Sequence, residues 1–134
     1  MKIIIARAAE FSLLLCLAAF GNANGYAEIV NAQWEGGAFS HKANIAPKKF
    51  LEVCGKLKMG EAVAWRFSGA APTDFNIHYH AGKDVAYAEN RKQTIAAEGT
   101  LSAPVDQHYC WMWTNHTPQP LNIDVSLKQL KAGK

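Results

Sequence analysis

The chain has 134 residues, of which 49% are hydrophobic and 19% are charged, and its formal net charge at pH 7 is +3. This length suits one domain with a single hydrophobic core. The small positive balance, with lysines scattered along the chain, gives no electrostatic reason to expect nucleic acid as a partner. No apolar run approaches the ~20 residues of a membrane-spanning helix, so we expect no membrane span.

The N-terminus has the layout of a secretory signal peptide. Two early positive charges precede an apolar run at 11–20, and small and polar residues follow it. We expect cleavage close to Ala27, which gives a signal peptide at 1–27 and a single mature domain at 28–134. The predicted location is therefore periplasmic or secreted.

Apolar and polar residues alternate along much of the mature chain, as they do in strands with one buried and one exposed face. The expected strands are part of 28–34, 49–57, 61–68, 74–80, 84–88, 98–103, 108–115 and, as an eighth, 120–129. Short strands at this spacing predict an all-β fold, an antiparallel β-sandwich of about seven to eight strands.

Turn-forming residues separate these strands. The expected turns lie at 69–73, 81–84, 102–106 and 116–120. Residues 35–47 contain Gly-Gly and a proline without a clear period, and they predict a loop. The segment 88–99 could form one helical turn, but Ile95 has no apolar partners at helical spacing.

Five stretches between about residues 49 and 130 carry a further pattern. They are FLEVCGKLKMGEAV, DFNIHYHAGKDVAY, EGTLSAP, YCWMWTN and LNIDVSL. In this order they resemble the GOLD domain family, small β-sandwiches of the secretory pathway and of bacterial exported proteins. The resemblance implies a GOLD-like core at about 49–130 and a binding or interaction module, whose partner could be another envelope or secretory-pathway protein. It names no ligand.

Two cysteines, Cys54 and Cys110, remain after removal of the signal peptide. In an oxidising compartment such a pair most often forms a disulfide. We therefore predict a Cys54–Cys110 bridge. Buried free thiols and a metal-bound thiolate are the alternatives.

Three of the five histidines lie in two strand-like runs, FNIHYH and HYCWMWTN. On regular strands His78 and His80 share one face, as do His108 and Met112, whereas the aromatic residues form the opposite face and the natural core. Imidazole suits copper and zinc, and a thioether favours Cu(I). We predict a metal site at these four residues, with copper favoured and zinc second.

The leading hypothesis is thus a small exported protein that binds a transition metal. The alternative is a structural or protein-interaction module of GOLD type whose histidines are incidental. We do not expect an enzyme, because no serine or cysteine is placed with a base and an orienting carboxylate. His41 and His116 are interpreted as surface residues, in a loop and a turn respectively.

Overall fold

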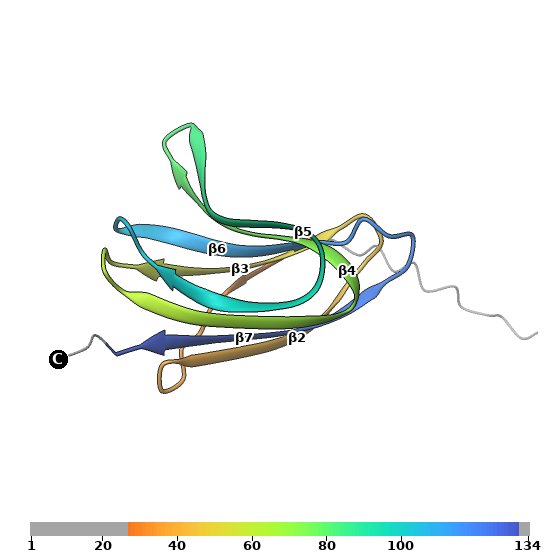
Figure 1. The fold of residues 1–134 in the computed structure, drawn as a ribbon, viewed down its shortest axis with the longest axis horizontal. Coiled ribbons are helices and arrows are strands. Elements are labelled where there is room, and N and C mark those ends of the chain that lie inside the picture. The colour runs from red at the N-terminus through yellow and green to blue at the C-terminus, as the bar shows by residue number, and fades with distance from the viewer. Residues whose placement is uncertain (1–26, 132–134) are drawn as a thin grey trace, which may run out of the picture.

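The computed structural model describes residues 27–131, and residues 1–26 of the predicted signal peptide lie outside the described residues. The described part contains seven β-strands (Figure 1). They are β1 (Glu28–Asn31), β2 (Ala38–Ile45), β3 (Phe50–Leu57), β4 (Ala62–Ala81), β5 (Asp84–Ser102), β6 (Gln107–Thr114) and β7 (Leu121–Leu130). Within residues 27–131, no helix is long and apolar enough to cross a membrane. The domain limits of 28–134 stay a prediction.

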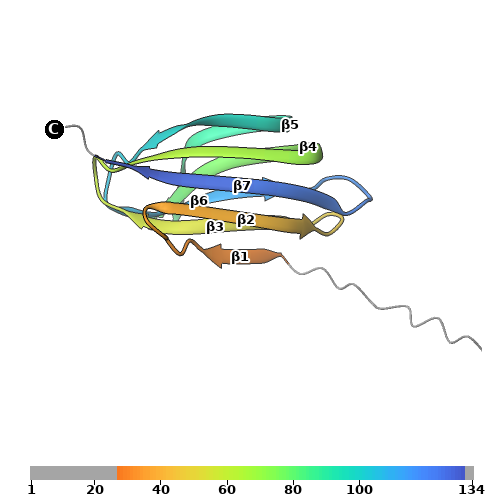
Figure 2. The ribbon, with the colours of Figure 1, turned by 90° about the horizontal axis from the view of Figure 1, so that it is seen from below.

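One mixed sheet bends into two layers. Its strand order is β1-β3-β6-β4-β7-β2, and β5 pairs with β4 beside this path. One layer contains β1, β3 and β6, the other contains β7 and β2, and the long β4–β5 hairpin curves through both (Figures 1 and 2). The predicted all-β sandwich is confirmed, with one parallel pair, β1 on β3, added to the antiparallel ladders.

Strand β4 changes its partner at its centre. Residues 62–69 pair with β7, whereas residues 74–78 pair with β6. Pro72 lies between these two ladders, and the register with β5 shifts at the same place. Proline, which has no N–H, is tolerated in a strand at such a bulge. The predicted turn at 69–73 is therefore wrong, because its glycine and proline mark a bulged crossing between layers within one strand.

The predicted loop at 35–47 is also wrong. Residues 38–45, inside the predicted loop at 35–47, form β2 and pair with β7. The alternation there is weak because His41 and Ala43, which are polar or small, occupy two of the more buried positions. Residues 88–99, between the predicted strands 84–88 and 98–103, form the middle of β5 through pairing with β4, which agrees with the lack of apolar partners at helical spacing for Ile95.

The inner faces of both layers form one aromatic core around the bend in β4. The ring centroids of Phe67 and Phe75 are 4.8 Å apart, and Trp113 of β6 lies 5.6 Å and 5.3 Å from these two rings. The indole of Trp65 covers Gly99, which lies opposite it on β5. A Cβ atom at Gly99 would come within 2.5 Å of that indole, so the packing requires glycine there.

Asp74 fixes the bend from outside the core. Its Oδ1 accepts a hydrogen bond from the backbone N–H of Gln93 at 3.0 Å, and Gln93 has a φ of 49°, in the left-handed region. Its Oδ2 lies 3.0 Å from Lys92 Nζ and 3.1 Å from His116 Nε2. Burial raises the pKa of Asp74, but the Gln93 hydrogen bond and the neighbouring Lys92 and His116 outweigh burial, and the pKa lies below its ordinary value.

We expect Asp74→Asn to lower the free energy of unfolding by about 1.5–3 kcal/mol at pH 7, because hydrogen bonds to a charged group are lost. The folded pKa of Asp74 is depressed, so its contribution is complete above the ordinary aspartate value of 3.8 and is lost as the pH falls through the folded value. Urea unfolding of the wild type and the variant at pH 7 and pH 3 measures the loss of unfolding free energy and its dependence on pH. A loss of the same size at both pH values would contradict a stabilising role for the Asp74 carboxylate.

The matched control is Asp124→Asn. Asp124 pairs with Lys42 at 3.4 Å, but both side chains are mostly exposed. Such a surface pair contributes about 0–1 kcal/mol, so this variant should stay close to the wild type.

Candidate functional site

The four predicted metal ligands belong to β4 and β6, on the face opposite the core. Tyr109, Trp111 and Trp113 of β6 are fully buried in the core, as predicted from the alternation. The other face of these strands, with β3 beside them, is the outer face of its layer. We call it the outer face below.

A disulfide lies at the centre of the outer face. Cys54 of β3 and Cys110 of β6 are directly opposite each other in the antiparallel ladder, with their Cα atoms 4.1 Å apart. The predicted bridge is confirmed. While it is closed, neither sulfur is available as a thiolate.

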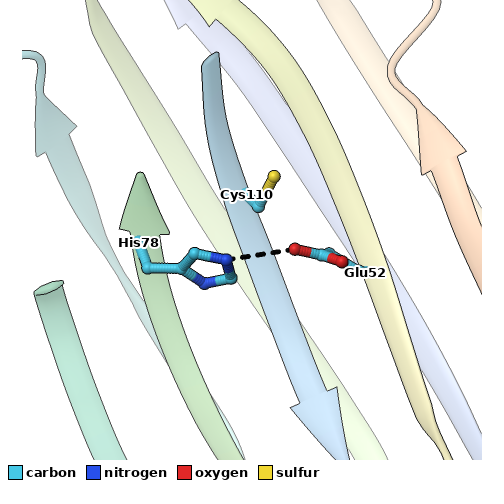
Figure 3. Close-up of side chains that lie close together, drawn as sticks. All are labelled: Glu52, His78 and Cys110. Atoms are coloured by element: carbon cyan, nitrogen blue, oxygen red, sulfur yellow. Dashed lines mark ion pairs between the residues drawn. The ribbon is translucent and has the colours of Figure 1, made fainter. Parts of the chain in front are cut away.

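His78 lies opposite Cys110 on the other side of β6. Its Nε2 is 3.1 Å from Glu52 Oε1 (Figure 3). Its Nδ1 is 2.8 Å from Asn76 Oδ1. Only 7% of the His78 side chain and 14% of the Glu52 side chain are exposed. Burial lowers the pKa of His78; the Glu52 carboxylate opposes this effect and His80 adds to it, and the pKa lies below its usual value. His78 is therefore held between the Asn76 amide and the Glu52 carboxylate, beside a disulfide.

Among residues 27–131, Glu52, His78 and Cys110 form a group whose ligand atoms lie within 4.8 Å of one another (Figure 3). Of the predicted ligands, only His78 belongs to this group. Sequence reasoning missed Glu52, although its spacing of two residues from Cys54 on a strand places both on one face.

The other predicted ligands lie around this group. The ring of His80 is 5.4 Å from that of His78, measured between centroids, and its side chain is exposed. His108 is exposed and lies opposite Lys56, and Met112 lies opposite Glu52. All four are on the outer face, but the set as a metal site stays a prediction.

The two remaining histidines join segments of the fold. His41 is half-buried on β2, not in a surface loop as predicted, and its Nε2 lies 3.2 Å from Glu28 Oε1 on β1. This contact links the two edge strands of the sandwich. His116 is exposed, as predicted, and pairs with Asp74 at the bend.

A second candidate site is the end of the sandwich where the β3–β4 turn (58–61) and the β5–β6 loop (103–106) meet, at the left of Figure 1. We call it the loop end. Met59 is 70% exposed there and Val105 is 40% exposed.

Hydrogen bonds hold the loop end in one conformation. Asp106 Oδ1 accepts from the backbone N–H of Met59 at 2.7 Å, and the backbone of 60–61 exchanges two hydrogen bonds with Ala103. The hydroxyl of the buried Tyr109 donates to the carbonyl of Val105 at 2.7 Å. The two apolar side chains are thus presented on a rigid support, which lowers the entropy that binding a partner would cost.

Asn115 is a further buried polar residue, and its role is structural. Its Nδ2 donates to the carbonyls of Ile45 and Gln119 at 3.0 and 2.7 Å, and its Oδ1 accepts from the backbone N–H of Thr117 at 2.9 Å. It is fully buried, so this amide shapes the β6–β7 loop and is not on the surface.

The fold defines a class, the small two-layered β-proteins in which a long hairpin is shared between layers. No protein-family model and no curated protein sequence matches the chain, so GOLD membership stays a prediction. Among solved structures, the chain is similar to PliG of Aeromonas hydrophila, a periplasmic inhibitor of g-type lysozyme. The TM-score is 0.62 at 11% identity, and the likeness covers 78% of this chain and 98% of PliG.

Two further structures extend this comparison. A mutant of PliG from Escherichia coli gives a TM-score of 0.56 at 14% identity, covering 78% of this chain and 99% of that one. The pre-peptidase C-terminal domain of a Bacillus anthracis collagenase gives 0.56 at 10% identity, covering 80% and 99%. At these identities the likeness establishes the fold alone.

We expect the Cys54→Ala/Cys110→Ala double variant to lose about 4 kcal/mol of unfolding free energy, because the bridge joins residues 56 positions apart. Denaturant unfolding of the mature protein measures the loss. Wild type reduced with excess dithiol is the matched control and should behave like the variant. A loss below about 1 kcal/mol would show that the ladder holds β3 and β6 together without the bridge.

Proposed function

We propose that the chain is a small exported binding protein without catalytic activity, and that it recognises a protein, namely a lysozyme of the g type or an enzyme closely similar to it. The supporting observation is that the chain spans nearly the whole architecture of two PliG inhibitors, 98% and 99% of their lengths.

The loop end is the surface that fits this role best. Two exposed apolar side chains, Met59 and Val105, stand on loops whose backbone is already hydrogen-bonded in place. An open hollow beside them is lined in part by Trp34, Lys58 and Asp106. Methionine and aromatic residues are enriched in protein interfaces, and a preorganised loop loses little entropy when it docks.

Export to the periplasm or to the exterior belongs to the same proposal. The signal-peptide pattern before residue 28 supports it, and a disulfide is typical of an oxidising compartment. A GOLD-type interaction module would share this location and the use of a protein partner, but with a partner from the envelope or secretory pathway.

Inhibition of a g-type lysozyme by the purified mature protein tests the proposal. We expect inhibition by the wild type, and we expect Met59→Ser/Val105→Ser to weaken it by roughly 5- to 30-fold or more, as loss of an interface hot spot does. Ile95→Ser is the matched control, because Ile95 is 53% exposed on β5, away from the loop end. No binding by the wild type would exclude this partner, and unchanged inhibition by the double variant would place the contact elsewhere.

A second candidate function is transition-metal binding by the outer face, with copper favoured and zinc second. The specific observation in its favour is that His78, His80, His108 and Met112 all lie on that face, with the first two rings 5.4 Å apart. Imidazole with a thioether is a donor set that favours copper.

Metal analysis of the oxidised protein after dialysis against copper or zinc tests this candidate. We expect His80→Ala/His108→Ala to abolish binding without loss of stability, because both side chains are exposed. Met112→Leu keeps the volume and removes the sulfur, so it should weaken Cu(I) more than Zn(II). Copper binding by the double histidine variant that matches the wild type would rule this ligand set out.

A further inference from the structure

The outer face holds ionisable and sulfur-containing side chains in a place where they are sheltered from water. Cys54 and Cys110 are 4% and 6% exposed, and the Glu52 and His78 side chains are 7–14% exposed. Taking a carboxylate and an imidazole out of water is costly, and a buried pair of this kind is weak evidence for a stabilising role. Partner recognition at the loop end uses none of the four.

We propose that reduction of the Cys54–Cys110 disulfide creates a zinc site whose ligands are Cys54, Cys110, His78 and Glu52. The site shares His78 with the second candidate site but uses neither of its exposed histidines, His80 and His108, and it does not depend on partner recognition. All four ligand types are ones that zinc binds in proteins.

The strand register brings the four residues together. Glu52 and Cys54 alternate on β3, so they share the outer face. Cys110 lies opposite Cys54 on β6, and His78 lies opposite Cys110 on β4. Three adjacent strands therefore supply the donors, on a rigid sheet and not on mobile loops.

The distances suit a four-ligand site. His78 Nε2 and Glu52 Oε1 are 3.1 Å apart, and the ligand atoms of these two residues and of Cys110 lie within 4.8 Å of one another (Figure 3). In a tetrahedral zinc site, bonds of about 2.0–2.3 Å put ligand atoms roughly 3.3–3.8 Å apart. The sulfur of Cys54 is bonded to that of Cys110, so opening the bridge places a fourth donor at the same point.

The disulfide controls the site through its chemistry. A dithiol reductant gives two electrons and two protons to the S–S bond; that bond breaks, two cysteine thiols form, and the reductant becomes a disulfide. Zinc then binds both sulfurs as thiolates and their two protons go to solvent. With the bridge closed, only His78 and Glu52 remain as donors, which is too few for a closed tetrahedral site.

Spectroscopy with Co²⁺, followed by displacement with Zn²⁺, tests the proposal on the mature protein. We expect the reduced wild type to bind one Co²⁺ with tetrahedral d–d bands and sulfur-to-metal charge transfer, and the oxidised wild type to show neither. His78→Gln and Glu52→Gln should each weaken binding by about tenfold or more. His41→Gln on β2, a histidine variant outside both candidate ligand sets, is the matched control and should leave the affinity unchanged.

Thermal unfolding provides a second measurement, since the reduced protein is less stable. Zn²⁺ should raise the melting temperature of the reduced wild type, or restore its fold if reduction unfolds it, and should do neither for Cys54→Ser/Cys110→Ser.

Equal metal binding in both redox states, or binding that survives both His78→Gln and Glu52→Gln, overturns the proposal. If the oxidised protein binds metal and His80→Ala/His108→Ala loses it, the metal lies at the second candidate site, which contains these two exposed histidines. Lysozyme inhibition is measured in a separate experiment, and its outcome does not depend on whether the reduced protein binds zinc.

Discussion

The contact between Phe67 and Phe75 is the interaction on which the rest of the structure depends. Both rings belong to β4, one on each side of its bend, and their centroids are 4.8 Å apart. For them to meet, the strand must fold back on itself, and its two halves must then pair with different neighbours, β7 and β6. The bend thus makes two layers from one sheet, and Trp113 packs against both phenylalanine rings. Aromatic packing of this kind adds to the free energy gained from apolar burial.

The same bend decides where the chemistry-bearing residues lie. Because β6 pairs with the second half of β4, Cys110 is held between Cys54 on one side and His78 on the other. The core uses the opposite faces of these strands, where Tyr109 and Trp111 are fully buried. The outer face of a sandwich layer is normally wet, so a sheltered Glu–His pair beside a disulfide is an arrangement that apolar packing alone does not require.

Strands β3 and β6 connect the two candidate sites. β3 carries Cys54 and runs into the 58–61 turn, and β6 follows directly from the 103–106 loop. The loop end is rigid because its two loops are bonded to each other and to Tyr109, which lies next to Cys110. Partner binding at the loop end and metal binding at the disulfide are nevertheless separate proposals, because they use different side chains and different chemistry.

Local pattern in the sequence was enough to predict the all-β class, most strand positions and the aromatic core faces, because alternation with period two reports which side chains face inward. The Cys54–Cys110 bridge was predicted on a different ground, a pair of cysteines in an exported chain. It could not identify β2, which depends on pairing with β7, or the crossing at 69–73, which depends on the pairing of β4 with β7, β6 and β5. Glu52 joined His78 and Cys110 only through the register between strands far apart in sequence. Register is set by tertiary packing, and for that reason the sequence supplied the residue types of the candidate site while the fold alone decided which of them meet.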